Sequence, residues 1–319
     1  MISEFRLGAN GLTEYNKVDN TISLLCELEA AALQKNSEGY YLCYSGGKDS
    51  DTLLDIALKS GVKFTANYNV TGIDPTECIK HIKRRRHELK EKGIDLFIHP
   101  PNRFTTGIYK GQFKNMWRLI IHKGIPPMRI KRYCCEHLKE RGGKGRVCLT
   151  GVRWDESTSR KSRAPMEKIG ATKSTKILFN DNSENRRQFE NCMAKGKLVI
   201  NPIIDFTTND IWEYRERENI RFCNLYQSKT DRIGCIGCPM AGSSGMLSDF
   251  ERHPYIKSLY LQSFDIMLKE RARKGLPTNT MWNCAEAVME WWIYGTDKEQ
   301  KQIEEQIGFE DEENWEEME

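Results

Sequence analysis

The sequence contains no long hydrophobic run, no internal repeat and no segment of low complexity. Of its 319 residues, 39% are hydrophobic and 29% are charged. No apolar run approaches the roughly 18 residues that are needed to span a bilayer. The first residues, MISEFRLGANGLTEY, lack the basic-then-apolar order of an export signal. We therefore expect a folded cytoplasmic protein that has no membrane partner.

Histidines with metal-ligand spacing are also absent. His99, His122, His137 and His253 are isolated from one another in the sequence. Cysteine, by contrast, is plentiful, with eleven residues. In a reducing compartment a disulfide framework is excluded, so cysteine spacing indicates metal binding, catalysis or packing.

Positive charge is concentrated in the body of the chain. Residues 304–319 carry nine acidic side chains and no basic one, so the remainder holds 49 basic against 36 acidic residues, a net charge of +13. A basic body fits an anionic partner such as a nucleotide or a nucleic acid, and it equally fits a solvated lysine-rich surface. The acidic tail is expected to be a frayed, solubilising end.

Apolar segments alternate with helical patterns over the first two thirds of the chain. Strands are expected at residues 40–44, 63–70, 94–99, 147–152 and 198–204, and helices at 18–34, 51–58, 75–92, 109–122, 134–141 and 208–219, the last capped by Thr207 or Thr208. This alternation predicts an α/β fold with a parallel sheet flanked by helices. Residues 153–196 are polar and predict a long functional loop with a short helix at 184–193. Helical patterns near 248–273 and 283–294 predict a helical C-terminal appendage.

A glycine-containing loop, SGGKDS at residues 45–50, lies between a predicted strand and a predicted helix. Gly46 and Gly47 allow the backbone to approach an anion, and the helix contributes its positive N-terminus. Lys48 can neutralise phosphate charge, and Asp49 can hold a magnesium ion. The hydroxyls of Ser45 and Ser50 can donate hydrogen bonds. The loop is not the GxxxxGK[ST] nucleotide motif, and the alternative interpretation is a connecting turn.

Four cysteines form two tight pairs, Cys134-Cys135 and Cys235-Ile236-Gly237-Cys238. Soft thiolate ligands favour zinc or an iron-sulfur cluster. Adjacent cysteines are awkward ligands for one tetrahedral zinc ion, whereas a cubane offers separate iron atoms. An iron-sulfur cluster fits best, with zinc or unligated thiols as alternatives. Of the remaining cysteines, three are expected to be core thiols and one to lie in a helix-packing pattern, namely Cys26, Cys43 and Cys148, and Cys284.

The SGGKDS loop resembles the PP-loop of the ATP pyrophosphatase superfamily. Further segments follow in family order and resemble the phosphoadenosine phosphosulfate (PAPS) reductase group: TGIDP at 71–75, the cysteine pair at 134–135, TGVRWDES at 150–157 with Arg160, INPI at 200–203, DIW at 210–212 and CIGC at 235–238. The resemblance implies a Rossmann-like, adenine nucleotide alpha hydrolase-like fold. It implies cleavage of ATP between the alpha and beta phosphates. It also implies a 4Fe-4S cluster on Cys134, Cys135, Cys235 and Cys238.

The site that follows from the motifs and the resemblance holds ATP and Mg²⁺ on residues 45–50. Nucleotide contacts are expected from Thr71, Gly72 and Gly151. Arg153 and Arg160 follow the fourth strand, at the sheet edge where open α/β folds bind ligands, and guanidinium groups pair with phosphate. The expected catalytic residues are Lys48, Asp49, Arg153 and Arg160. A solvated basic loop is the alternative interpretation for the arginines.

Two departures from the reductases are informative. The chain lacks the C-terminal Glu-Cys-Gly-x-His-like segment that carries the nucleophilic cysteine of the reductases. It also keeps the complete SGGKDS loop at residues 45–50, which the reductases often do not. It thus resembles more closely the ATP pyrophosphatase component of DNA phosphorothioation systems, and more loosely the cluster-dependent tRNA thiolation enzymes. The partners implied are an adenine nucleotide, a nucleic-acid substrate, a cysteine desulfurase or another sulfur donor, and a second copy in a homo-oligomer. The alternatives are a sulfonucleotide reductase that produces sulfite, and a non-catalytic nucleotide-binding or nucleic-acid-binding module.

Two further sequence patterns are relevant to nucleic-acid binding. The predicted helix at 75–92 has His81 and His87 interleaved with basic residues, and it could either follow a nucleic-acid backbone or form an exposed face. The basic residues are Lys80, Lys83, Arg84, Arg85, Arg86 and Lys90. Trp282, Trp291 and Trp292, with Met289, are expected to form the core of the helical appendage rather than a base-stacking platform. The expected organisation is an N-terminal helical segment (1–36), a nucleotide-binding domain (37–240), a helical region (241–303) and the acidic tail (304–319).

Overall fold

The protein divides into two compact units, each made of separate segments of the chain. Unit 1 comprises Met1–Tyr68, Thr76–Ile98 and Gly142–Ile233, and unit 2 comprises Asn69–Pro75, His99–Arg141 and Gly234–Glu319. The structure, a computed structural model, describes residues 2–8, 11–156, 160–161, 163–169, 174–177, 197–228, 232–276, 281–299 and 302. The linear domain boundaries expected from the sequence stay a prediction, and the acidic tail lies outside the described residues.

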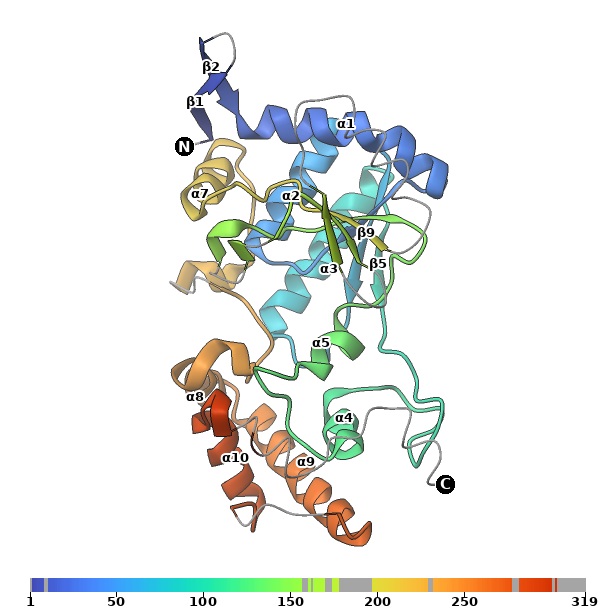
Figure 1. The fold of residues 1–319 in the computed structure, drawn as a ribbon, viewed down its shortest axis with the longest axis vertical. Coiled ribbons are helices and arrows are strands. Elements are labelled where there is room, and N and C mark those ends of the chain that lie inside the picture. Colours follow the sequence, from blue (N-terminus) through green and yellow to red (C-terminus); the bar gives the residue numbers. More distant parts are fainter. Residues whose placement is uncertain are drawn as a thin grey trace. The chain divides into compact units, whose positions relative to one another are not determined.

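Unit 1 is built around a seven-stranded sheet with the order β5-β4-β3-β6-β9-β7-β8 (Figure 1). The strands are β3 (Tyr40–Cys43), β4 (Phe64–Asn69), β5 (Leu96–His99), β6 (Val147–Leu149), β7 (Met166–Ile169), β8 (Ser174–Ile177) and β9 (Lys197–Ile200). Strand β3 runs parallel to β4 and β6, and β6 runs parallel to β9. Tyr40, Tyr41 and Leu42 of β3 are buried, as expected of a parallel strand covered on both faces. Cys43, which was expected to be a core thiol, is only half-buried at the end of the strand. The predicted α/β fold is confirmed.

The last two strands of the sheet were not anticipated. Strand β7 pairs antiparallel with β9 and with β8. Both β7 and β8 lie inside residues 153–196, where the sequence predicts a loop, so that prediction is wrong for these two strands. Their short polar sequences, MEKI and STKI, lack the apolar run that marked the central strands. The helix predicted at 184–193 lies outside the described residues.

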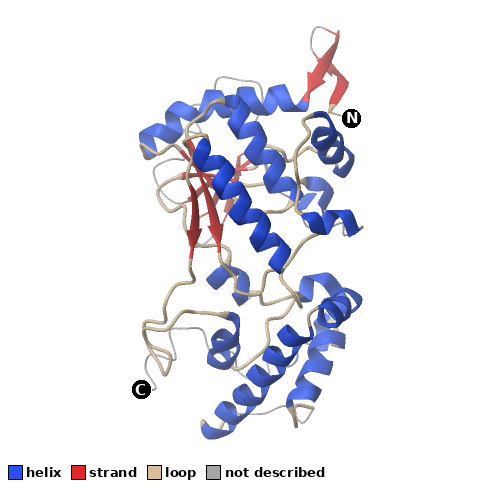
Figure 2. Ribbon diagram, turned by 180° about the vertical axis from the view of Figure 1, so that it is seen from behind, coloured by secondary structure: helices blue, strands red, loops and turns tan. Residues whose placement is uncertain are grey.

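Helices cover the sheet of unit 1 (Figure 2). They are α1 (Lys17–Lys35), α2 (Lys48–Ser60), α3 (Thr76–Glu91) and α7 (Thr208–Arg217), with the short 3-10 helices η1 (Trp154–Glu156) and η3 (Asn224–Ser228). Helices α1 and α7 both pack against α2. A hairpin of β1 (Ser3–Gly8) and β2 (Gly11–Asn16), which the sequence did not predict, precedes α1. Asn16 caps α1 by accepting hydrogen bonds from the backbone N–H groups of Val18 and Asp19.

Unit 2 is helical and is held by an aromatic core. Its helices are α4 (Met116–Lys123), α5 (Tyr133–Leu138), α8 (Gly242–Arg252), α9 (Pro254–Arg273) and α10 (Ala285–Tyr294), with the 3-10 helix η4 (Pro239–Ala241). Trp282, Met289, Trp291 and Trp292 are all buried, which confirms them as core residues. The indole of Trp292 donates to the carbonyl of Pro127 at 2.6 Å. No helix in the described parts of the chain is long and apolar enough to cross a membrane.

Three expectations for the C-terminal region and the cysteines need correction. The helical pattern near 248–273 is two helices, because Pro254 has no backbone N–H to continue α8 and instead starts α9. Cys26 is exposed, not buried, because it follows Leu25 around α1 and leaves the buried face. Cys284 is also exposed, since it precedes α10 as an extended capping residue. Cys148 is fully buried, as predicted.

A buried ion pair fixes the start of α7. Thr207 caps the helix as predicted: its hydroxyl accepts the N–H of Asp210, and the Asp210 carboxylate accepts the N–H of Thr207. The Lys17 ammonium lies 2.7 Å from the same carboxylate, and both side chains are at most 5% exposed. Burial acts to raise the pKa of Asp210, but the hydrogen bonds from Lys17 and Thr207 dominate and lower it to about 2. The pair therefore stabilises the fold wherever Asp210 is ionised.

We predict that Asp210→Asn lowers the free energy of unfolding by about 3 kcal/mol at neutral pH, because Lys17 is left buried without its counter-ion. The folded pKa lies below the unfolded value, so the stabilisation is present above the unfolded pKa and is lost as the pH falls through the folded one. Urea unfolding at neutral pH and at stepwise lower pH should show the difference from wild type shrinking between about pH 4 and pH 2. Glu216→Gln, at an exposed position of α7, is the matched control. Equal stability of Asp210→Asn and wild type at neutral pH would contradict the assignment.

Candidate functional site

The turn from β3 into α2 places residues 45–50 at a helix N-terminus. Gly46 has a φ of +73°, and a Cβ there would lie 2.9 Å from the Cγ1 of Ile82, so only glycine fits. Gly47 is the N-cap of α2, and no side chain caps the helix from that position. The first N–H groups of α2 are therefore open to groups outside the helix.

Hydroxyl groups surround these N–H groups. The Ser50 hydroxyl donates to the carbonyl of Gly47 at 2.8 Å and lies 3.2 Å from the hydroxyl of Ser45. The N–H of Lys48 donates to the hydroxyl of Tyr226 at 2.9 Å. Tyr226 lies on η3, 178 residues away in sequence, and nothing in the sequence pointed to it. The loop is thus lined with donors from two distant segments.

Tyr226 is held in place by aromatic neighbours. Its ring packs edge-on against Trp212, with centroids 5.9 Å apart, and lies 6.0 Å from the ring of Phe222. Burial raises the pKa of Tyr226, so the hydroxyl keeps its proton. No described residue accepts that proton in a hydrogen bond, while the oxygen accepts from Lys48. Tyr226 can therefore act as a fixed donor at the loop.

Charged groups converge on the same turn. Lys48 is 6% exposed, and its ammonium lies 5.6 Å from the ring centroid of Tyr226 and 3.8 Å from the carboxylate of Asp49. The guanidinium of Arg153 donates to Asp49 at 2.7 Å and to the carbonyl of Phe206 at 3.1 Å, and Arg153 is only 1% exposed. In this structure Arg153 holds Asp49 in position.

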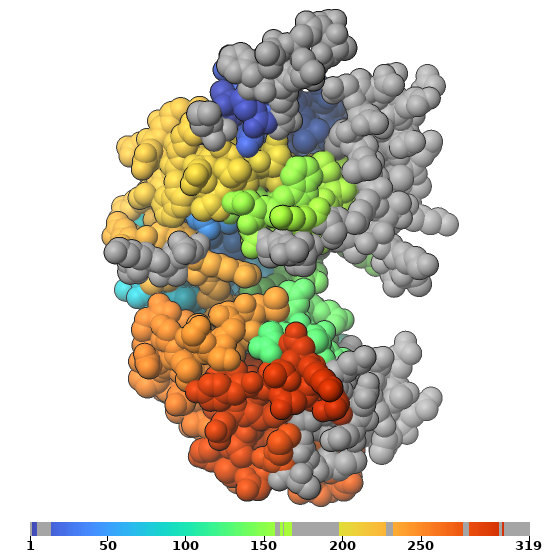
Figure 3. Space-filling view, turned by 60° about the vertical axis from the view of Figure 1, so that its left-hand side comes forward, coloured from blue at the N-terminus to red at the C-terminus, as the bar shows by residue number. Residues whose placement is uncertain are grey.

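The segment after β6 lies against the start of α2. A Cβ on Gly151 would lie 3.2 Å from the carbonyl of Asp49, so this glycine permits close approach of the two backbones. Glu156 accepts a hydrogen bond from the N–H of Arg153 at 3.0 Å and also pairs with the guanidinium of Arg160. Asp155 binds the N–H of Thr208, and Figure 3 shows this segment (yellow-green) beside the start of α7 (yellow). The structure therefore brings together Asp49, Gly151, Arg153 and Arg160, which the sequence had placed in one site.

A buried network anchors α2 to α3. The Asp51 carboxylate accepts the Tyr44 hydroxyl at 2.6 Å and lies 2.8 Å from the Nε2 of His81. Arg84 donates to the Nδ1 of His81 at 2.6 Å, which leaves Nε2 as the protonated nitrogen that faces Asp51. His81 is 2% exposed and Asp51 is fully buried. His81 is thus a core residue and not part of a nucleic-acid-binding face. The guanidinium of Arg84 is only partly available to another partner, because it donates to His81.

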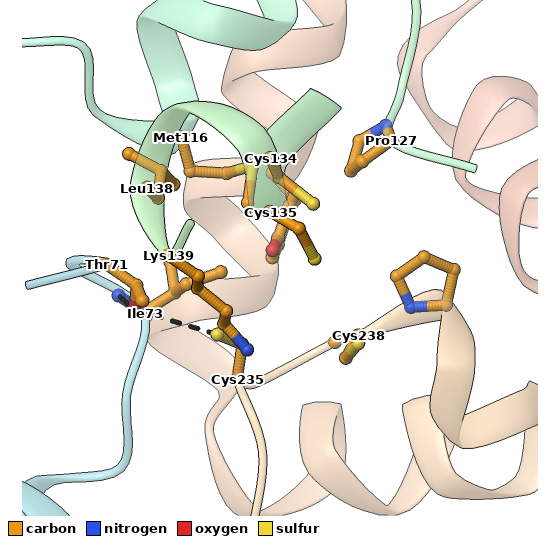
Figure 4. Close-up of a pocket in the computed structure, with 13 residues that line it drawn as sticks. Thr71, Ile73, Met116, Pro127, Cys134, Cys135, Leu138, Lys139, Cys235 and Cys238 are labelled. Atoms are coloured by element: carbon orange, nitrogen blue, oxygen red, sulfur yellow. Dashed lines mark hydrogen bonds between the residues drawn. The ribbon is translucent and has the colours of Figure 1, made fainter. Parts of the chain in front are cut away.

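Unit 2 contains the four cysteines, which line one cavity (Figure 4). Cys134 and Cys135 lie on α5, and Cys235 and Cys238 lie on the segment leading into η4. Thr71 and Lys139 line the same cavity. In the described part of the chain, no three His, Cys, Asp or Glu side chains are arranged to hold a single metal ion. The cluster, zinc and unligated-thiol interpretations of the four cysteines therefore stay predictions.

Hydrogen bonds tie Cys235 to the segment at residues 71–75. Its sulfur lies 3.6 Å from the hydroxyl of Thr71 and 3.6 Å from the carboxylate of Asp74. Thr71 also donates to Asp74 at 2.7 Å. Thr71, which the sequence predicts as a nucleotide contact, therefore lies in the cysteine cavity of unit 2, and Gly72 is its exposed neighbour.

The pKa values of Cys135 and Cys235 are shifted in opposite directions. The hydrogen bond from Cys134 lowers the pKa of Cys135 to about 6, helped by Lys139 and Arg132 against the effect of burial. Burial raises the pKa of Cys235 to about 12. Ligation by thiolates requires deprotonation, so loading this set with a metal centre releases protons.

Comparison with known proteins identifies a family whose matched region includes both the loop at residues 45–50 and the four cysteines. Residues 39–241 match the phosphoadenosine phosphosulfate reductase domain. An uncharacterized protein of Methanocaldococcus jannaschii is 25% identical over 251 residues, which is 76% of this chain and 44% of that protein. Sulfate adenylyltransferase subunit 2 of Methylobacterium radiotolerans is 26% identical over 216 residues, 64% of each chain. The match thus spans less than two thirds of each relative's length.

Weak matches among solved structures include two proteins of Candida species. FMN adenylyltransferase of Candida glabrata is 13% identical, with a TM-score of 0.43, over 69% of this chain and 61% of that chain. Phosphoadenylyl-sulfate reductase of Candida auris is 13% identical, with a TM-score of 0.37, over 72% of this chain and 96% of that chain. The family match rests on sequence and covers more than half of the chain. The protein therefore belongs to the phosphoadenosine phosphosulfate reductase domain family, within the PP-loop superfamily of Rossmann-like nucleotide-binding folds.

Proposed function

We propose that the chain binds Mg-ATP at residues 45–50 and cleaves it to AMP and pyrophosphate, activating an acceptor for sulfur incorporation. The observation that supports this most is the start of α2, where open N–H groups, a buried lysine and three hydroxyls meet. A helix N-terminus of this kind favours phosphate oxygens. The family match adds an adenine nucleotide as the expected source of that phosphate.

Each side chain of the loop has a distinct role in this proposal. Lys48 neutralises charge that builds on the departing pyrophosphate. Ser45 and Tyr226 donate hydrogen bonds to phosphate oxygens, whereas the Ser50 hydroxyl donates to the carbonyl of Gly47 and holds the turn. Asp49 holds Mg²⁺, and Arg153 orients the Asp49 carboxylate through the 2.7 Å hydrogen bond.

The arginines after β6 divide between positioning and binding. In its described contacts, the guanidinium of Arg153 binds Asp49 and the carbonyl of Phe206 inside the protein. We therefore assign the expected phosphate contact to Arg160, whose side chain is 31% exposed. Glu156 holds Arg160 at this position. Gly151 contributes close backbone approach. Thr71 lines the cysteine cavity of unit 2.

The proposed reaction has two steps. An acceptor oxygen attacks the alpha phosphorus of ATP, the bond to the bridging oxygen of the beta phosphate breaks, and pyrophosphate leaves with that electron pair. The acceptor is then an adenylate. Sulfur at the sulfide level displaces AMP, which carries the acceptor oxygen away; the sulfur comes from hydrosulfide, or from a persulfide of a cysteine desulfurase system that a thiol reductant reduces by two electrons and is itself oxidised to a disulfide. No net oxidation occurs in these two steps.

The four cysteines fit a 4Fe-4S cluster. They come from two segments and line one cavity, and soft thiolate ligands suit an iron-sulfur cluster. Cys134, Cys135, Cys235 and Cys238 would hold the cluster, and Lys139 would offset part of the thiolate charge. Such a cluster supplies iron that can bind sulfur or carry an electron. The hydrogen bond to Thr71 fixes the orientation of the Cys235 sulfur.

The name of one relative suggests a further partner. Sulfate adenylyltransferase subunit 2 is by its name one part of an assembly. We therefore include a partner subunit, or a second copy of this chain, among the proposed partners, beside the sulfur donor.

We expect Lys48→Ala to slow pyrophosphate release from ATP by about a hundredfold, because the charge on the leaving group loses its buried cation. Asp49→Asn should show a similar loss that added Mg²⁺ relieves only in part. Coupled detection of pyrophosphate and of AMP, on protein prepared without oxygen, measures both. Lys63→Ala, at an exposed position of the same unit, is the control. Release of phosphate instead of pyrophosphate, or an unchanged rate in Lys48→Ala, would count against the proposal.

Tyr226→Phe should weaken binding of pyrophosphate by about tenfold, because a hydrogen bond to a charged oxygen is lost. Isothermal titration calorimetry with pyrophosphate and Mg²⁺ checks this. Tyr255→Phe, at an exposed position of α9, should leave the affinity unchanged. Tighter binding by Tyr226→Phe would instead mean that the phenol occupies the Lys48 N–H and competes with phosphate.

Cys235→Ser should abolish the broad visible absorbance and the iron content expected of anaerobically purified protein, because a buried ligand is lost. Iron and sulfide analysis, together with absorbance and electron paramagnetic resonance after reduction, report the cluster directly. Cys26→Ser, at an exposed thiol of unit 1, should keep full iron content. Colourless wild-type protein that holds zinc in equal amount would refute the cluster.

A further inference from the structure

Two side chains at the ends of the loop at residues 45–50 bind each other. Tyr44 is the residue immediately before the loop, and Asp51 is the residue immediately after it. The Tyr44 hydroxyl donates to the Asp51 carboxylate at 2.6 Å, and both side chains are buried. This hydrogen bond closes the loop at its base. We refer to Tyr44 and Asp51, together with His81 of α3, as the clasp.

His81 joins the two ends of the loop from a separate helix. Its Nε2 lies 2.8 Å from one oxygen of the Asp51 carboxylate, while the Tyr44 hydroxyl donates to the other oxygen. The Tyr44 oxygen also lies 3.2 Å from Nε2, so the three side chains form a closed triangle. Because a buried polar group that loses its partner costs free energy, none of the three turns away without loss.

The same face of α3 also contacts the loop between the two ends. The thiol of Cys78 donates to the carbonyl of Ser45 at 3.6 Å. A Cβ on Gly46 would lie 2.9 Å from the Cγ1 of Ile82. Cys78, His81 and Ile82 are three and four residues apart, so they share one face of the helix. Helix α3 therefore supports both the base of the loop and its first residues.

The charge of the clasp carboxylate is offset by its surroundings. Asp51 lies in the first turn of α2, where the positive end of the helix favours a carboxylate. The Nε of Arg85 lies 3.8 Å from that carboxylate. Arg84 donates to the Nδ1 of His81, which leaves the protonated Nε2 facing Asp51. These groups reduce the repulsion between Asp51 and a phosphate bound at the loop.

We propose that Tyr44, Asp51 and His81 are positioning residues, which hold the loop N–H groups in the phosphate-binding arrangement before the ligand arrives. A site formed in advance loses less conformational freedom on binding, and so it binds its ligand more tightly. The three side chains are buried below the loop and act through its backbone, without contact to the phosphate. This inference rests on the proposed function for the identity of the ligand.

The first experiment compares two tyrosine variants by isothermal titration calorimetry with pyrophosphate and Mg²⁺. Tyr44→Phe removes only the clasp hydroxyl. It should weaken binding by about tenfold, because ordering even one freed backbone residue on binding costs about that factor. Tyr214→Phe is the matched control, since the Tyr214 hydroxyl donates to Asp55 at 2.8 Å, one turn further along α2. It should bind pyrophosphate like the wild type.

A second pair of variants tests the contribution of α3. His81→Gln keeps an N–H donor for Asp51, whereas His81→Leu has none. His81→Leu should weaken pyrophosphate binding at least as much as Tyr44→Phe, and His81→Gln should recover most of the loss. In both Tyr44→Phe and His81→Leu, the KM for ATP should rise by a larger factor than kcat falls, because the clasp acts on binding. Thermal unfolding followed by circular dichroism checks that each variant is folded, and the tyrosine pair decides if His81→Leu is not.

The inference is overturned if Tyr44→Phe binds pyrophosphate like the wild type, or if His81→Gln recovers nothing. It is also overturned if Tyr214→Phe loses as much affinity as Tyr44→Phe, since a general loss of stability would then explain both. Pyrophosphate release from ATP is measured on the same preparations. Equal binding by Tyr44→Phe and wild type, with normal release by the wild type, would remove this inference and leave the proposed function. The expected loss in Tyr44→Phe, without any release by the wild type, would do the opposite.

Discussion

The N–H groups at the start of α2, which no side chain of the N-cap residue occupies, are the feature on which the candidate nucleotide site depends. A helix N-terminus leaves its first N–H groups without partners, and at most helices a side chain of the N-cap residue supplies one. Here Gly47 has no side chain to do so, and Gly46 adopts a backbone conformation that admits only glycine. The turn therefore keeps a positive, hydrogen-bonding surface where an anion can be bound.

Distant parts of the chain then support this one turn. Arg153 fixes Asp49, Gly151 lies against the backbone of α2, and Tyr226 binds the N–H of Lys48. Beneath the loop, the buried contact between Asp51 and His81 ties α2 to α3. Because each contact comes from a different element, the geometry of the loop is a property of the whole folded unit rather than of its six residues.

The sequence was sufficient for the local features and not for the long-range contacts. The central strands, the loop and the Thr207 cap follow from apolar periodicity and from residue chemistry that acts over a few positions. Strands β7 and β8 were not predicted because their sequences are polar and short. The break between α8 and α9 at Pro254 was not predicted because the helical pattern of apolar residues continues across it. Tyr226 could not be found, since a pairing across 178 residues leaves no local pattern. The role of Arg153 changed for the same reason, because its burial against Asp49 arises only in the folded chain.

The most direct test of the account is a crystal structure of anaerobically prepared protein with Mg²⁺ and an ATP analogue that carries a methylene bridge between the alpha and beta phosphorus. The account predicts the beta and gamma phosphates over the N–H groups that follow Gly46, with Mg²⁺ at Asp49 and the Tyr226 hydroxyl within hydrogen-bonding distance of a phosphate oxygen. A triphosphate bound elsewhere in the protein, or a loop that stays free of it at saturating analogue, would contradict the account.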